Sequence, residues 1–197
     1  SMYASFLGIP QVITKLNRTE YNDVFRNRVI IPIIDIRGNV VAFGGRVLDD
    51  TKPKYINTEG TLAYTKSRNL FALNFAKNTG RELNLCEGYM DVIAMHQAGF
   101  TNTVASLGTA FPDEQIQLIA RYADRINLIF DADGAGQKAT RRAIDNLRKT
   151  GLDVRVVTIP DGKDPDEYIK NNGAEAFRLL LDRSATAVEY RLLEIGR

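Results

Sequence analysis

Two aspartates one residue apart, Asp131 and Asp133, directly follow a short apolar run in the stretch NLIFDADGAGQKATRRA. A second apolar run, LNLC, leads directly into Glu87. A third, VVTIP, leads into DGKDPDEY, which carries Asp161, Asp164 and Asp166. Carboxylates that converge repel one another, so a fold keeps such a cluster where a cation neutralises it. Hard oxygen ligands suit Mg²⁺ or Mn²⁺, and such ions hold substrate phosphates in phosphoryl chemistry. The pattern predicts that Asp131 and Asp133 hold divalent metal.

The D-x-D-G step also has a plainer interpretation, because aspartate is common in solvated loops and is a good helix N-cap. Glu87 alone could accept hydrogen bonds from the N–H groups of a following helix. Gly88, Gly134 and Gly136 fit loops that approach a ligand closely, but they fit ordinary turns as well. Three acidic strand ends in one chain favour the metal site over the solvated loop.

An alternation of strand and helix patterns positions these acids. Strands are predicted over 82–88, 101–106, 125–130 and 153–160. Helices are predicted over 89–99, 112–123 and 135–151, and further helices from about Asp166 to the end. This rhythm is typical of a mostly parallel sheet covered by helices on both faces, in the α/β class. Ligands bind such sheets beyond the carboxyl ends of the strands, which is where the acids stand.

The first part of the chain has a different, β-rich pattern. Two β-branched runs between Arg28 and Leu48 flank the turn residues 37–39, which predicts a hairpin. Gly44-Gly45 indicates a bulge or a close backbone approach. Residues 49–61 predict an ordered loop or a short extended segment, and helical spacing appears around 67–78. We therefore predict a smaller mixed α+β subdomain over 1–78, a parallel-sheet subdomain over 79–170 and a C-terminal helical segment over 171–197.

The composition narrows the class of protein. The 197 residues are 44% hydrophobic and 25% charged, as in ordinary globular proteins, and the formal charge of +2 gives no sign of nucleic acid by itself. The single cysteine, Cys86, excludes a disulfide framework and a cysteine-based zinc site, and we expect it to be buried. His96 is expected to be a surface or packing residue. No apolar run approaches the roughly 18 residues of a membrane helix, and no secretory signal stands at the start.

Basic residues gather between positions 37 and 68, where only three acids oppose them. They are Arg37, Arg46, Lys52, Lys54, Lys66 and Arg68, with Tyr55 and Asn57 among them. Taken alone, they are most simply solvated loop residues. Beside an acidic metal site they can hold triphosphate or template phosphates, and Tyr55 can stack on a base. For the basic residues of helix 135–150 we expect a structural role, such as complementing the helix dipole.

Several longer strings resemble a known family. LCEGYMDVIA, ASLGTA, IFDADGAGQKA and PDGKDPDEYI are similar to the TOPRIM core of the DnaG-type bacterial DNA primases. Upstream, FRNRVIIPIIDIRGNVVAFGGRVL and PKYINT resemble the subdomain that precedes TOPRIM in that family, so the resemblance runs from Phe25 to about Phe177. A strand-end glutamate with a D-x-D also occurs in topoisomerases, OLD-type nucleases and RecR-type recombination mediators. The longer strings are specific to the primases.

The resemblance implies a role for each matching residue. Glu87, Asp131 and Asp133 would be catalytic. Mg²⁺ or Mn²⁺ would be held by Glu87, Asp91, Asp131, Asp133, Asp164 and Asp166. Nucleotide and DNA would be held by Arg46, Lys54, Tyr55, Asn57, Lys66 and Tyr89. Asp161 is expected to shape the turn before Lys163 instead.

The resemblance further implies the catalytic core of a DNA-directed RNA polymerase. Such an enzyme makes short RNA primers on single-stranded DNA for replication, by two-metal nucleotidyl transfer in the bacterial cytoplasm and without a membrane. Its partners would be the template strand, ribonucleoside triphosphates, the RNA–DNA hybrid product and, through a domain that this chain lacks, the replicative helicase. Because the chain begins abruptly and residues 2–21 match the family poorly, we expect a fragment of a longer protein. Two alternatives are another TOPRIM nuclease and a non-catalytic module that binds nucleotide or single-stranded DNA.

Overall fold

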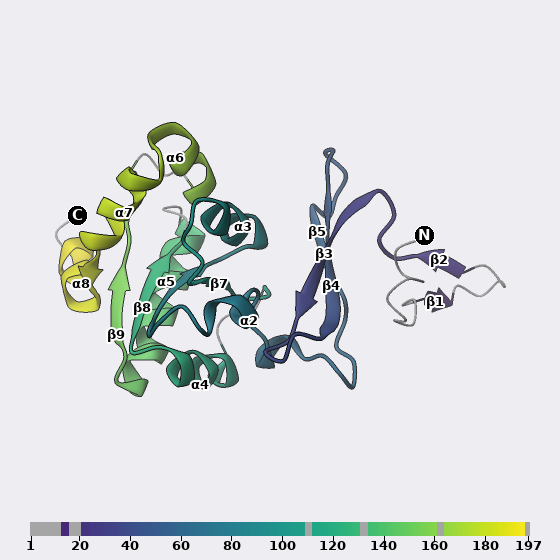
Figure 1. Ribbon diagram of the computed structural model, residues 1–197, viewed down its shortest axis with the longest axis horizontal. Coiled ribbons are helices and arrows are strands. Elements are labelled where there is room, and N and C mark those ends of the chain that lie inside the picture. Colours follow the sequence, from purple (N-terminus) through teal and green to yellow (C-terminus); the bar gives the residue numbers. More distant parts are fainter. Residues whose placement is uncertain (1–12, 16–20, 109–111, 131–133, 161–163, 196–197) are drawn as a thin grey trace.

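The strands of the described residues form three sheets (Figure 1). The structure is a computed structural model that describes residues 13–15, 21–108, 112–130, 134–160 and 164–195. Near the N-terminus, β1 (Ile13–Lys15) pairs with β2 (Tyr21–Asp23). An antiparallel sheet follows, in the order β3 (Arg28–Ile34), β4 (Val40–Val47) and β5 (Tyr55–Asn57). The largest sheet has the order β10–β9–β8–β6–β7 and occupies the other half of the molecule.

β3 and β4 form the predicted hairpin. Its turn is held by Asp35, whose backbone N–H donates to the Asn39 carbonyl at 2.8 Å. The Asp35 carboxylate accepts from the backbone N–H groups of Arg37 and Asn39 at 2.9 and 2.8 Å. Gly38 has φ of +97°, a conformation that favours glycine.

The two glycines of β4 mark a close approach rather than a bulge. The register shift in this hairpin lies opposite Ile33 and Ile34, which pair with Ala42 and Val40, whereas Gly44 and Gly45 stay in regular register. A side chain at Gly45 would meet the Phe25 ring at 2.6 Å, and one at Gly44 would meet Tyr89 at 3.0 Å. The second of the two predicted explanations for these glycines is therefore confirmed.

The largest sheet is mostly parallel, as predicted. Its parallel strands are β6 (Glu82–Cys86), β7 (Thr103–Ala105), β8 (Arg125–Ile129) and β9 (Asp153–Val156). The edge strand β10 (Ala185–Thr186) is antiparallel and interrupts a segment that the sequence pattern predicts as helical. A strand of two residues is too short to leave an alternating pattern. Thr186 then caps the following helix, because its hydroxyl accepts from the Glu189 N–H at 3.2 Å and its own N–H donates to the Glu189 carboxylate at 2.7 Å.

Helices cover both faces of this sheet (Figure 1). They are α2 (Leu73–Ala76), α3 (Tyr89–Gln97), α4 (Asp113–Tyr122), α5 (Gly134–Leu147), α6 (Pro165–Asn172), α7 (Ala174–Asp182) and α8 (Ala187–Ile195), with 3-10 turns η1 (Lys66–Arg68) and η2 (Arg148–Thr150). Leu128 of β8 belongs to the cluster that includes Ile119 of α4 and Ile144 of α5. The next residue, Ile129, belongs to the opposite cluster, with Val92 of α3 and Phe177 of α7. Successive strand residues thus bury both faces, as expected of parallel sheets.

The predicted helix over 67–78 is broken into η1 and the short α2. Between them, Phe71 and Ala105 exchange backbone hydrogen bonds of 2.9 and 3.2 Å in an isolated β-bridge. Ala72 then adopts a left-handed φ of +64° before α2 begins. Pairing with a distant strand has overridden the local helical spacing.

A buried polar chain crosses the amino-terminal half of the sheet. Asn84 and Asn127 are register partners on β6 and β8, and each is 1% exposed. The Asn127 amide donates to Asn84 Oδ1 at 2.9 Å and to Glu82 Oε1 at 2.7 Å, while the Asn84 amide donates to Asn102 Oδ1 at 3.0 Å. These amides are satisfied by one another, as buried polar groups must be.

The predictions for the two remaining singled-out residues are confirmed. Cys86 is fully buried, and His96 packs with its Nε2 2.8 Å from the Thr103 carbonyl oxygen. None of the described helices combines the length and the apolar character that a membrane crossing requires.

Candidate active site

The carboxyl ends of β6, β8 and β9 meet at one edge of the large sheet. Cys86 pairs with Ile129, and Leu128 pairs with Val156, so the three strands that lead into acids are direct neighbours. Glu87 follows β6 immediately and is exposed at this edge. The predicted metal ligands Asp131 and Asp133 lie outside the described residues, as does Asp161. The strand order therefore brings the carboxyl ends of these three strands to a common edge.

Asp91 is tied to the residue that follows Glu87. Gly88, the N-cap of α3, donates its N–H to Asp91 Oδ2 at 3.2 Å. A carboxylate in the first turn is favoured by the helix dipole. The acid that the family resemblance places near the metals therefore also holds the loop between β6 and α3.

Asp164 and Asp166 have different surroundings at the start of α6. Asp164 is its N-cap, and the carboxylate accepts the Glu167 N–H at 2.7 Å. Asp166 accepts from Lys170 Nζ at 2.6 Å, one turn later. Asp164 is exposed to solvent despite its capping bond. The pair predicted to act together is therefore held by two separate local contacts.

Charges carried by both halves of the molecule influence the pKa of Tyr55. This residue is 39% exposed, and its partial burial raises the pKa of the hydroxyl. The Arg46 guanidinium opposes that rise, and the carboxylates of Asp91 and Asp164 add to it. Arg46 of the small sheet and the carboxylates of Asp91 and Asp164 beside the large sheet therefore shift the pKa of the same hydroxyl in opposite directions.

Two cations lie over that ring. Arg46 on β4 is the register partner of Tyr55 on β5, and its Cζ lies 5.7 Å from the ring centroid. Lys54 Nζ lies 6.0 Å from the same centroid. Both distances are within cation–π reach of about 6 Å. Paired cations on a partly exposed aromatic ring are the composition that binds phosphates and stacks a base.

Tyr89 joins this cluster to α3. Its hydroxyl donates to Asn57 Oδ1 on β5, and its ring lies edge-on to Tyr55 with centroids 6.1 Å apart. Tyr89 is 6% exposed, and burial raises the pKa of its hydroxyl. The predicted nucleotide-binding residues Tyr55, Asn57 and Tyr89 are therefore neighbours, but Tyr89 is covered and Tyr55 is not.

The donor atoms of this edge suit a hard divalent ion. Glu87, Asp91 and Asp164 all offer carboxylate oxygens, which Mg²⁺ and Mn²⁺ prefer. Within the described ranges, which leave out 131–133 and 161–163, no three acidic, histidine or cysteine side chains gather closely enough to hold a metal. The donor chemistry fits such an ion, and the sequence supplies further carboxylates at Asp131 and Asp133.

Lys66 lies on a separate turn from Arg46 and Lys54. It opens η1, where the carbonyls of Lys66 and Asn69 accept from Gln115 Nε2 at 3.0 and 2.9 Å. Gln115 is fully buried on α4. The predicted site does not include this glutamine, although a polar residue on the apolar face of helix 112–123 is a visible signal. Gln115 positions the turn that carries Lys66.

Arg28 is a second residue that the predicted site lacks. Its guanidinium donates to the carbonyls of Pro53 and Lys54 at 2.8 and 3.3 Å. It therefore braces the loop that presents Lys54 and Tyr55. No local sequence pattern distinguishes this arginine from a solvated one.

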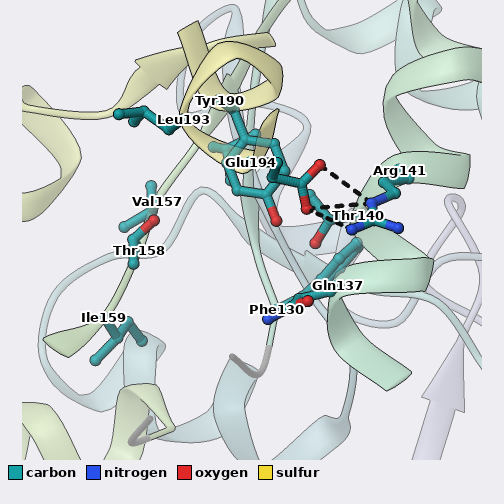
Figure 2. A pocket seen from close by; sticks show the side chains of 11 residues that line it. Phe130, Gln137, Thr140, Arg141, Val157, Thr158, Ile159, Tyr190, Leu193 and Glu194 are labelled. Carbon is teal, nitrogen blue, oxygen red and sulfur yellow. Dashed lines mark hydrogen bonds and ion pairs between the residues drawn. The ribbon is translucent and has the colours of Figure 1, made fainter. Parts of the chain in front are cut away.

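A pocket of about 220 Å³ lies between the end of β9, α5 and α8 (Figure 2). Figure 2 shows Tyr190 and Glu194 of α8 facing Thr140 and Arg141 of α5. Arg141 donates to the Glu194 carboxylate at 2.9 and 3.1 Å, and this pairing lowers the pKa of Glu194. Arg141 is thus held in a structural ion pair, in agreement with the structural role expected for the basic residues of this helix.

Two family models match the chain in succession. The model described as the DNA primase catalytic core, N-terminal domain, matches residues 7–77, and the model described as Toprim-like matches residues 84–169. A DNA primase of Clostridium acetobutylicum is 49% identical over 183 residues, which are 92% of this chain and 30% of that protein. The chain belongs to the DnaG-type family of bacterial DNA primases. It spans less than a third of the length of that curated primase.

Solved primases share the fold. The E. coli primase catalytic core matches with a TM-score of 0.86 and 35% identity, covering 93% of this chain and 60% of that one. A DnaG primase catalytic domain bound to single-stranded DNA matches with a TM-score of 0.84 and 35% identity, covering 91% of this chain and 59% of that one. These matches confirm the predicted fold class and support the primase family over the nuclease and the binding module. TOPRIM primases use divalent metal ions in general.

Two substitutions at Asp164 separate its role as the N-cap of α6 from the role of its negative charge. Asp164→Ala is expected to lower the free energy of unfolding by about 1 kcal/mol, because α6 loses its N-cap, whereas Asp164→Asn should keep most of that stability. Both variants are expected to reduce metal-dependent primer synthesis, because both remove the carboxylate charge. Urea unfolding and ribonucleotide incorporation measure the two effects. Full activity of the asparagine variant would reduce Asp164 to a helix cap.

Proposed function

We propose that this chain forms part of the catalytic core of a DNA primase, a DNA-directed RNA polymerase that synthesises short RNA primers on single-stranded DNA for replication. One observation carries the proposal: the cations Arg46 and Lys54 lie over the ring of Tyr55, and that ring lies edge-on to Tyr89, the second residue after Glu87 at the acidic edge. Nucleotidyl transfer requires both cations and acids, because a triphosphate must be bound beside groups that hold metal. The family membership supports the same activity.

The acidic residues and the basic residues would have different roles. Glu87, Asp91, Asp131, Asp133, Asp164 and Asp166 would hold Mg²⁺ or Mn²⁺. Bound there, the ions would neutralise the triphosphate and stabilise the oxygens that attack and leave at the α-phosphate. Arg46, Lys54 and Lys66 would hold nucleotide and template phosphates, and the exposed ring of Tyr55 would stack on a base. Glu87, Asp131 and Asp133 are the acids proposed as catalytic.

The proposed partners follow from this chemistry. They are single-stranded template DNA, ribonucleoside triphosphates and the RNA–DNA hybrid product. The single-stranded DNA bound in a solved relative supports the first of these. Contact with the replicative helicase would involve parts of the longer primases that this chain does not span, and the site of action would be the bacterial cytoplasm. The division into subdomains at 1–78, 79–170 and 171–197 stays a prediction.

Ribonucleotide incorporation on a single-stranded template tests the proposal. We expect incorporation that requires Mg²⁺ or Mn²⁺ and that Asp131→Ala reduces by at least about 100-fold, the scale of losing one group that stabilises transition-state charge. The assay is run in a primase polypeptide that contains this chain. Equal incorporation by the wild type and Asp131→Ala would overturn the site. Binding of nucleotide and metal without any incorporation would favour the non-catalytic module.

A further inference from the structure

Tyr89 occupies a notch formed by one cross-strand pair of the small sheet. Gly44 of β4 and Asn57 of β5 are register partners, and the ring of Tyr89 lies against both. A side chain at Gly44 would meet Cζ and Oη of Tyr89 at 3.0 Å, closer than real side chains normally come. The Tyr89 hydroxyl donates to Asn57 Oδ1. A side chain at position 44 would therefore force the ring to shift by a few tenths of an ångström.

The two strands that form this notch also carry Arg46 and Tyr55. Arg46 and Tyr55 form the second pair along from Gly44 and Asn57 on the same two strands. Side chains two residues apart on a strand point to the same face, about 7 Å apart. Tyr89 itself is the second residue after Glu87 in the sequence. Tyr89 therefore links the strand pair that carries Arg46 to the segment that carries Glu87.

Burial separates Tyr89 from the nucleotide-binding role that the family resemblance implies. It is 6% exposed and belongs to the core cluster that joins the small sheet to α3, with Ile33, Ala42 and Leu107. Tyr55 is exposed enough to meet a base, whereas Tyr89 is covered by Tyr55 and by Phe71, at ring distances of 6.1 and 5.2 Å. The hydroxyl of Tyr89, the one polar atom of its side chain, is already bonded within the protein.

We propose that Tyr89, seated on Gly44 and Asn57, is a positioning residue that fixes the cation-bearing sheet at its working distance from the acidic edge. This inference rests on the proposed primase activity. Tyr89 acts through Arg46, Tyr55 and Glu87 and does not touch the nucleotide. Displacing such groups by about 1 Å lowers the rate of the chemical step far more than it weakens binding.

Two substitutions and one matched control test the proposal in a primase polypeptide that contains this chain. Y89F removes the bond to Asn57, and G44A forces the Tyr89 ring to shift. The control, Y64F, removes a hydroxyl from the same cluster that has no hydrogen-bond partner among the described residues. We expect kcat of primer synthesis to fall about tenfold in Y89F and G44A. KM for ribonucleotides and Kd for single-stranded DNA should change less than about twofold, and Y64F should match the wild type in all three.

Other outcomes overturn the proposal. A raised KM with unchanged kcat in Y89F would show that Tyr89 touches the nucleotide. Equal losses in Y89F and Y64F would show that the cluster matters only for folding. If G44A does not fold, as judged by thermal unfolding, the comparison of kcat between Y89F and Y64F still tests the proposal. A Glu87→Gln enzyme measured in parallel separates the two claims: its full activity would defeat the proposed function, whereas an inactive Glu87→Gln beside a fully active Y89F would defeat only the positioning role.

Discussion

Glu87→Gln is expected to lower primer synthesis by at least about 100-fold, because the change removes one charge from the acidic edge while keeping the size of the side chain. Glu87 is exposed where β6 ends, beside the strand that leads to Asp131 and Asp133. Since surface substitutions rarely alter stability by more than about 0.5 kcal/mol, folding should be retained. Ribonucleotide incorporation at saturating Mn²⁺ measures the activity, and urea unfolding measures the stability.

Glu114→Gln is the matched control for this charge. Glu114 is also an exposed glutamate near the start of a helix, in the first turn of α4, and it takes no part in the proposed site. Its activity should stay within about twofold of the wild type, as expected for a surface change away from the site. Similar losses in the two variants would mean that overall negative charge, rather than the position of Glu87, supports synthesis.

Arg46→Ala is expected to weaken binding of single-stranded DNA about tenfold at moderate salt. The substitution removes a cation that lies over the ring of Tyr55 in the proposed nucleotide- and DNA-binding cluster. If this cation neutralises one phosphate of a single strand, its removal should also reduce the slope of log affinity against log salt concentration by about 0.7. The DNA affinity of Arg46→Lys should lie between those of the wild type and Arg46→Ala, because lysine keeps the charge but lacks the planar group that stacks on an aromatic ring. Fluorescence anisotropy over a salt series measures both quantities.

Arg37→Ala controls for the loss of positive charge from the same hairpin. Arg37 lies in the turn, and β4 separates that turn from Arg46 by the six residues from Val40. At about 3.3 Å per residue the separation is about 20 Å. Affinity and salt slope should therefore remain close to those of the wild type. If both alanine variants weaken binding equally, DNA is held by diffuse charge and not by the cluster at Tyr55.

Much of the fold is predictable because the residues that determine each element are close together in the sequence. Apart from Asn127, the buried positions of β8 are all apolar, and the hairpin turn depends on Asp35, Gly38 and Asn39, which are close in sequence. The failures have a different cause. α2 is shortened by pairing between Phe71 and Ala105, and β10 exists only because Ala185 meets Val156. Contacts between distant positions leave no periodic signal in either segment.

The sequence predicts which types of residue form the candidate site, but it does not predict which side chains contact one another. Acids at strand ends mark the edge, because parallel strands all end on the same side. That Asp164 caps α6, that Asp91 binds Gly88, and that Tyr89 is buried while Tyr55 is exposed depend on side-chain geometry. The bracing residues Gln115 and Arg28 act through carbonyl groups, which every residue carries. A sequence cannot show which carbonyls are approached.

The buried amides of Asn84 and Asn127 have a consequence for the opposite end of their strands. If β8 slid along β6 by two residues, the apolar faces would still match, but the buried hydrogen bond from the Asn127 amide to Asn84 Oδ1 would be lost, and an unpaired buried group costs about 1–3 kcal/mol. Hydrophobic packing alone does not forbid that slip, whereas this buried bond opposes it. The two amides lie about 10 Å along the strand from Glu87. The strand register that aligns the acidic edge is thus stabilised by buried groups near the opposite ends of the same strands.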